Sequence, residues 1–254
     1  MLRLFTQNCP PPEQKQERLS RGAVLAFTLA EVLITLGIIG VVAALTIPNL
    51  AANHKEKQTI SKLKKVYSTF SNAYMMTINE YGTPDTWDEI NFAPDRTKVF
   101  WDRLKPTLKF LKECNSNNRF KCWDADNYFI YLNGDSTQNH IHNGKQITAV
   151  LNDGTMIAFN AGVYYDTGCA RNGDYFACAD LTVKTDNSQK QVYGKNIFAF
   201  RFEHNILVPS GKKSEPNDCY SNSTGCTAWV IFNGNMDYLR CKDDLSWSGK
   251  SKCN

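Results

Sequence analysis

The sequence predicts an α+β protein, in which a long N-terminal helix packs on a largely antiparallel, disulfide-stapled β-sheet domain. Three observations lead to this fold class. An apolar run follows residue 26, an amphipathic helical stripe follows that run, and strand-like segments separated by Asn-Gly or Asp-Gly pairs fill most of the remainder. We therefore divide the 254 residues into four segments, 1–26, 27–52, 53–81 and 82–254.

The apolar run predicts a membrane span. Residues 32–47 contain neither a charge nor an amide side chain, and with their apolar flanks they reach the roughly 17–25 residues that cross a bilayer. A secretory signal cut after a small residue such as Ala44, a plain single-pass anchor and a prepilin leader all fit this run. Glu31 favours the last, because a carboxylate in a membrane segment costs about 2–3 kcal/mol and the other two have no use for it.

The helix is predicted to continue beyond Pro48, where it is expected to kink. Its second half carries large apolar side chains three or four residues apart, at Ile60, Leu63, Tyr67, Phe70, Tyr74, Ile78 and Tyr81. This spacing places them on one helical face, which we interpret as the face that docks on the C-terminal domain. The turn sequence that starts at Gly82 ends the helix.

Residues 82–254 form the predicted head. Apolar spacing around Pro106 indicates one or two short helices, at Phe100, Leu104, Leu108 and Leu111. Hairpin turns are indicated by the pairs that begin at Asn133, Asn143, Asp153, Asn172 and Asn233. Strand-like runs cover residues 128–132, 147–151, 155–159, 197–202 and 228–232. In the fourth run every second residue is Phe, so one face of that strand is aromatic, at Phe198, Phe200 and Phe202.

The nine cysteines indicate an oxidising compartment. Apart from Cys9 they lie beyond residue 113, and none of their spacings matches the Cys-x2–4-Cys pattern of zinc sites. Eight thiols allow 105 pairings, of which nearest-neighbour pairing is the simplest. It joins Cys114 to Cys122, Cys169 to Cys178, Cys219 to Cys226, and Cys241 to Cys253.

The sequence contains no catalytic constellation, so we predict no enzyme and no catalytic residue. Gly249-Lys250-Ser251 lacks the first glycine of a P-loop, and no Gly-x-Ser-x-Gly elbow occurs. His140 and His142 supply only two ligands, and Asp124, Asp126 and Asn127 begin like a calcium loop without its sixth-position glycine. We therefore predict no metal site. The net charge of +4 is too small and dispersed to indicate a nucleic-acid partner.

The stretch from Ala26 through Glu31, followed by the apolar run and Pro48, resembles the N-terminal cleavage and methylation motif of type IV pilins and type II secretion pseudopilins. The resemblance implies that prepilin peptidase cuts between Ala26 and Phe27, where the family usually has Gly before the cut. It also implies methylation of the Phe27 amine, and pairing of Glu31 with the N-terminal amine of a neighbouring subunit. Residues 1–26 are then a cytoplasmic leader, which is removed together with Cys9.

Two head segments are also similar to parts of large bacterial pilin-like proteins. One is LTVKTDNSQKQVYGKNIFAFRF, in which Asp186-Asn187 stands for an Asn-Gly pair and Asn196 for a second Asp. The other, TAWVIFNGNMDYL, resembles their C-terminal strand region. Some pseudopilins hold calcium in the head, so calcium remains the one cofactor that the resemblance leaves open.

The resemblance implies a structural subunit of a type IV pilus or type II secretion filament that polymerises through its N-terminal helix. The alternative is a minor subunit whose head binds a surface, a secreted substrate or DNA. The implied partners are other subunits, prepilin peptidase, an assembly ATPase, an inner-membrane platform and membrane lipid. The chain is expected to cross the bacterial inner membrane once, with its N-terminus cytoplasmic and its head extracytoplasmic, and then to join a filament at the cell surface.

Overall fold

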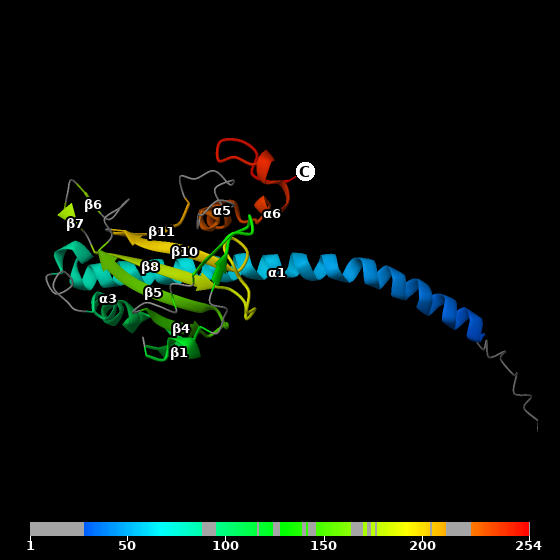
Figure 1. Cartoon of the computed structure of the whole chain (residues 1–254), viewed down its shortest axis with the longest axis horizontal. Coiled ribbons are helices and arrows are strands. Elements are labelled where there is room, and N and C mark those ends of the chain that lie inside the picture. The colour runs from blue at the N-terminus through cyan, green and yellow to red at the C-terminus, as the bar shows by residue number, and fades with distance from the viewer. Residues whose placement is uncertain are drawn as a thin grey trace, which may run out of the picture. The chain divides into compact units, whose positions relative to one another are not determined.

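Figure 1 shows the fold of the chain in a computed structural model. The structure describes residues 28–87, 95–115, 117–123, 128–138, 141, 146–163, 170–171, 174–175, 177–203, 205–211 and 225–253. The chain divides into two compact units, Met1–Asn49 and Leu50–Asn254.

The first element, α1, is a helix over Leu29–Tyr81 that continues through Pro48. The boundary between the two compact units falls one residue after this proline. Every side chain of α1 that is fully buried lies in the second unit, and the first of them is Thr59. The apolar part of α1 therefore belongs to the first unit, and its amphipathic part belongs to the second.

The main element of the second unit is a six-stranded sheet with the order β1-β4-β5-β8-β10-β11, in which every neighbouring pair is antiparallel. Its strands cover Phe110–Cys114, Ile147–Leu151, Met156–Val163, Ala177–Lys184, Ile197–Glu203 and Ile206–Pro209. The predicted α+β fold class with a largely antiparallel sheet is thus confirmed. A three-stranded sheet contains β3 (Ser136–Gln138), β2 (Tyr128–Ile130) and β9 (Gln191–Val192), and β6 (Ala170–Arg171) pairs with β7 (Asp174–Tyr175).

The remaining helices are short. Helix α3 covers Arg96–Leu104, α5 covers Cys226–Asn233 and α6 covers Tyr238–Cys241. Single 3-10 turns occur at Pro84–Thr86, Lys105–Thr107, Arg119–Lys121 and Lys242–Asp244. The predicted helix near Pro106 is therefore α3 with its 3-10 extension, but Leu111 lies in β1 and is 71 % exposed. Its apolar spacing continued the helical pattern past Pro106, where the proline favours an end to the helix.

The main core lies between one face of the six-stranded sheet and the helices α1 and α3. Phe198, Phe200 and Phe202 point into it from alternate positions of β10, as their spacing predicted. From α1, Leu63, Phe70 and Tyr74 are buried in this core, whereas Ile60, Tyr67 and Ile78 are partly buried against it. The last residue of the predicted stripe, Tyr81, is 40 % exposed.

A second, smaller core lies on the opposite face of the sheet. Ala158 of β5 and Ile197 of β10 pack there with Trp123, Phe129 and Tyr193. The rings of Phe129 and Tyr193 lie 5.0 Å apart on the side of the three-stranded sheet, and this aromatic pair packs with Ala158 and Ile197 of the larger sheet. Strand β10 consequently contributes side chains to both cores.

Two of the predicted hairpin turns are present in the structure. The Asn133 pair joins β2 to β3, and the Asp153 pair joins β4 to β5. Gly134 and Gly154 have φ values of 95° and 79°, which only glycine adopts without strain. The Asn143 pair and the Asn172 pair lie outside the described residues.

The prediction of a strand at residues 228–232 is wrong, because this run lies in helix α5. Gly234 ends that helix with a φ of 68° and donates its N–H to the carbonyl oxygen of Val230, so the Asn233 pair is a helix end and not a hairpin. Six successive residues of α5 are buried, from Cys226 to Ile231. A helix buried on all sides has no polar face, and its short apolar run has the same pattern as a buried strand.

Candidate functional site

The first part of α1 presents an exposed apolar surface. Leu33, Ile39 and Leu45 are between 61 and 72 % exposed, and the other large side chains between Leu29 and Leu50 are exposed in the same way. This helix is long and apolar enough to cross a membrane. It resembles a membrane-spanning helix in length and composition, and it differs from a core helix in that none of this segment is buried within the protein.

Glu31 closes the N-terminal end of this helix. Its Oε2 accepts hydrogen bonds from the backbone N–H of Thr28, at 2.8 Å, and from the Thr28 hydroxyl, at 2.9 Å. The Thr28 hydroxyl oxygen in turn accepts from the N–H of Glu31, at 3.2 Å. This reciprocal arrangement is a capping box, which gives the carboxylate a local partner within its own chain. The predicted cleavage residues Ala26 and Phe27 lie outside the described residues.

The lysines that follow the apolar segment hold loops of the head. Lys55 forms an ion pair with Asp186, at 2.8 Å, and Lys62 donates to the backbone carbonyl of Thr185, at 2.9 Å. These lysines lie seven residues apart, on one flank of α1. Lys65 reaches the turn between β4 and β5, where it pairs with Asp153 at 3.0 Å. Three of the lysines therefore bind the head directly.

Asp186 and Asn196 lie in the segment LTVKTDNSQKQVYGKNIFAFRF described above, and they contact each other. The Asn196 amide donates to Asp186 Oδ1 at 2.9 Å and to the Ser188 hydroxyl at 2.7 Å, and Ser188 donates to the same carboxylate. Burial alone would raise the pKa of Asp186, but the hydrogen bonds from Lys55, Ser188 and Asn196 outweigh it and hold this pKa well below its usual range. The loop is thus organised around an ionised carboxylate.

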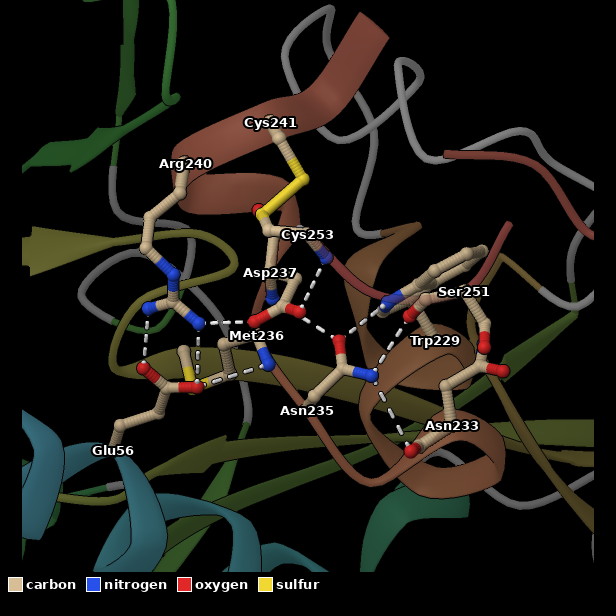
Figure 2. A network of polar contacts seen from close by, with 10 residues as sticks. All are labelled: Glu56, Trp229, Asn233, Asn235, Met236, Asp237, Arg240, Cys241, Ser251 and Cys253. Carbon is tan, nitrogen blue, oxygen red and sulfur yellow. Dashed lines mark hydrogen bonds and ion pairs between the residues drawn. A yellow bond between two sulfur atoms is a disulfide. The ribbon is translucent and has the colours of Figure 1, made fainter. Parts of the chain in front are cut away.

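Glu56 on α1 receives the C-terminal part of the head (Figure 2). Its Oε2 accepts from Arg240 Nη1 at 2.7 Å, and its Oε1 accepts from the backbone N–H of Met236 at 3.2 Å. Arg240 also pairs with Asp237. The hydrogen bond to Glu56 is the main reason why the pKa of Arg240 is raised. One carboxylate of the helix therefore binds both α6 and the turn before it.

The turn at residues 235–237 also binds the segment that follows α6. Asn235 donates to the carbonyl oxygen of Ser251 at 2.9 Å, and Asp237 Oδ2 accepts from the N–H of Cys253 at 2.8 Å. Asn235 Oδ1 accepts from the Trp229 indole at 3.1 Å, which fixes the turn to α5. Figure 2 shows these contacts next to the Cys241–Cys253 disulfide.

The structure contains the disulfides Cys114–Cys122 and Cys241–Cys253, which are two of the nearest-neighbour pairs. The first joins the end of β1 to the residue that follows the 3-10 turn at Arg119–Lys121, and the second joins the end of α6 to the C-terminal segment. Cys178 and Cys226 are also disulfide-bonded. Their predicted partners, Cys169 and Cys219, lie outside the described residues, as does Cys9.

The residues considered above as metal ligands also lie in parts of the chain that the structure does not describe. His140, His142, Asp124, Asp126 and Asn127 are all outside the described residues. Among the residues that the structure does describe, no group of three or more His, Cys, Asp or Glu side chains is placed to hold a metal ion.

A family model described as a family of unknown function (DUF6613) matches residues 49–252. The chain belongs to this family. The DUF6613 match begins at residue 49, one residue before the second compact unit, so it covers the amphipathic part of α1 together with the head. No curated protein and no solved structure matches the chain.

Sequence reasoning missed the residues that bind the C-terminal part of this DUF6613 chain to α1. Asn235 and Asp237 lie within the segment TAWVIFNGNMDYL, but that resemblance assigns them no role, and Glu56 and Arg240 belong to no motif. Contacts between residues so distant in sequence leave no periodic signal. A partial signal existed in Glu56 itself, because it is an acid among lysines on a face that turns toward the predicted core.

Proposed function

We propose that this chain is a structural subunit of a filament of the type IV pilin or type II secretion pseudopilin class. The observation that carries the proposal is that α1 has two different parts. The first part is apolar and exposed and has Glu31 in its first turn, whereas one face of the second part is buried in the core of the head. A subunit that polymerises through a helix needs this division, because one part packs among other helices and the other carries a folded domain. Residues 29–49 then anchor the subunit in the inner membrane before assembly.

The edges of the six-stranded sheet support assembly through the helix rather than through the head. Strand β1 carries a bulge between Phe110 and Lys112, and bulges disrupt pairing with a further strand. At the other edge, β11 ends in Pro209, and the N–H of Ala228 in α5 donates to the carbonyl of Ser210. Figure 1 shows α5 beside this edge. Both edges of the sheet are thus poor templates for strand addition.

The disulfides support an extracytoplasmic head. Structural disulfides such as Cys114–Cys122 and Cys241–Cys253 persist in oxidising compartments and are rare in the cytosol, so they favour a head outside the cytoplasm. With the head outside, the residues before Phe27 lie in the cytoplasm, where prepilin peptidase removes them. The further partners in this proposal are neighbouring subunits, an assembly ATPase and an inner-membrane platform.

Processing is the direct test of the proposal. The full chain is expressed in bacteria with and without a prepilin peptidase, and the membrane-bound product is analysed by intact mass and N-terminal sequencing. We expect the N-terminus to move to Phe27 only when the peptidase is present, with or without methylation of its amine. An N-terminus near Leu45 in both strains would identify an ordinary secretory signal and would overturn the proposal.

A further inference from the structure

The segment that follows α6, residues 242–253, forms a strap across the C-terminal corner of the head. Leu245 is buried in the main core, and the ring of Trp247 lies 5.0 Å from that of Trp229. The far end of the strap is held by the disulfide from Cys253 to Cys241, which joins it to the end of α6 (Figure 2).

The turn at residues 235–237 lies between this strap and α1. On one side it binds the strap, through the Asn235 amide on the Ser251 carbonyl and the Asp237 carboxylate on the Cys253 N–H. On the other side the N–H of Met236 donates to Glu56 of α1. Asp237 takes part on both sides, because its second carboxylate oxygen pairs with Arg240, which in turn binds Glu56.

We propose that the strap and its disulfide form a clasp, which fixes the turn at residues 235–237 and α6 onto Glu56 and so makes this attachment of α1 dependent on Cys241–Cys253. The ion pair between Arg240 and Glu56 is partly exposed, with 48 % of the Arg240 side chain accessible, and such a pair contributes little without a fixed geometry. The two strap contacts supply that geometry. The clasp acts on the start of the helix within the second compact unit, next to the apolar segment.

The clasp is also sensitive to reduction. A small dithiol that reduces Cys241–Cys253 transfers two electrons to the bond, becomes a disulfide itself and leaves one thiol on each cysteine. The strap then keeps the core contacts of Leu245 and Trp247, but its far end is held by the hydrogen bonds of the Ser251 carbonyl and the Cys253 N–H to the turn and by the backbone. Opening it removes two hydrogen bonds from the turn that holds Glu56.

Hydrogen exchange of the full chain in detergent micelles tests the clasp, with the double variant Cys241→Ser and Cys253→Ser. We expect the amides of residues 236–240 to exchange roughly tenfold faster than in the wild type, as the loss of two hydrogen bonds implies. The matched control is Cys114→Ser with Cys122→Ser, which removes a similar short loop closure elsewhere in the head. In that variant residues 236–240 are expected to exchange within about twofold of the wild-type rate. Equal rates in all three proteins, or an equal increase in both variants, would overturn the proposal.

A variant with all disulfides intact keeps the proposal testable if the serine variants unfold. Asp237→Asn removes the charge that links the strap to Arg240 while Cys241–Cys253 remains closed. We expect the same faster exchange at residues 236–240, with residues 245–250 still protected by their core contacts. Unchanged exchange at residues 236–240 in Asp237→Asn would show that the strap and the Glu56 contact are independent, and the clasp would be ruled out.

Discussion

The ring of Tyr67 on α1 stacks on the ring of Phe200 on β10, with centroids 5.8 Å apart and planes 14° from parallel. Two turns further along the helix, Tyr74 meets Phe202 edge-on at 4.9 Å. Helix and sheet are therefore joined by aromatic pairs in register, with every second residue of the strand facing the helical stripe. Such pairs contribute about 0.5–1.5 kcal/mol beyond the area that they bury.

Phe200→Ala is expected to lower the free energy of unfolding of the head by about 3–5 kcal/mol, because the side chain is fully buried and its loss leaves a cavity. Urea unfolding followed by tryptophan fluorescence measures the change. Phe232→Ala is the matched control, since Phe232 is 52 % exposed and touches the edge of the packed region at Trp247, so its loss should lower stability by about 1 kcal/mol. Equal losses in the two variants would contradict the location of the core.

Glu31→Leu is expected to insert into the membrane at least as well as the wild type, because it removes a costly intramembrane charge. Under the proposed function, in which Glu31 pairs with the N-terminal amine of a neighbouring subunit, filament yield should fall sharply, because that amine would lose a buried partner worth about 3–5 kcal/mol. The measurement is sheared filament, or secreted substrate, at matched membrane levels of the subunit.

Thr28→Ala separates this role from helix capping. It removes the hydroxyl from the capping box but keeps the Glu31 carboxylate, so the helix end should lose only about 1 kcal/mol. We expect its filament yield to stay close to that of the wild type. If Thr28→Ala and Glu31→Leu reduced the filament yield equally, helix capping alone would account for the effect of Glu31 on assembly.

The stability of the head should fall in acid, in part through Asp186. The pKa of this carboxyl is lowered in the folded protein from an unfolded value of about 3.9, so its contribution is complete above about pH 5 and is lost as the pH falls below 4. Asp186→Asn should therefore be less stable than the wild type at pH 6, and the difference should shrink toward pH 3. Thermal unfolding at a series of pH values measures this, and a difference that is constant with pH would contradict the assignment.

No cysteine of the native head should react with an alkylating reagent. Cys114, Cys122, Cys178, Cys226, Cys241 and Cys253 are all disulfide-bonded, and we expect Cys169 and Cys219 to be bonded as well. Mass spectrometry of the processed protein should show no adduct before reduction and eight after reduction and unfolding, which is the nine of the sequence less Cys9. One or more adducts on the native protein would contradict complete pairing.

Periodic features of this chain were predictable from sequence, and long-range contacts were not. The stripe on α1 and the alternation of Phe198, Phe200 and Phe202 report directly which face is buried, because helix and strand have fixed periods. Helix α5 has the sequence pattern of a strand, because its first six residues are all buried and leave it no polar face. The partners of Glu56 lie near the other end of the chain, so only the folded structure brings Arg240 to it.

The bulge of β1 has a consequence for subunits held side by side. In the filament proposed above, domains carried on neighbouring helices would experience one another at an effective concentration in the millimolar range, far above that of free subunits. At that concentration an unprotected edge strand would pair with the edge strand of an adjacent sheet through backbone hydrogen bonds, and the domains would aggregate. The bulge at Phe110–Lys112 interrupts the regular spacing of hydrogen-bonding groups that such pairing requires, so that neighbouring domains can be crowded together without fusing.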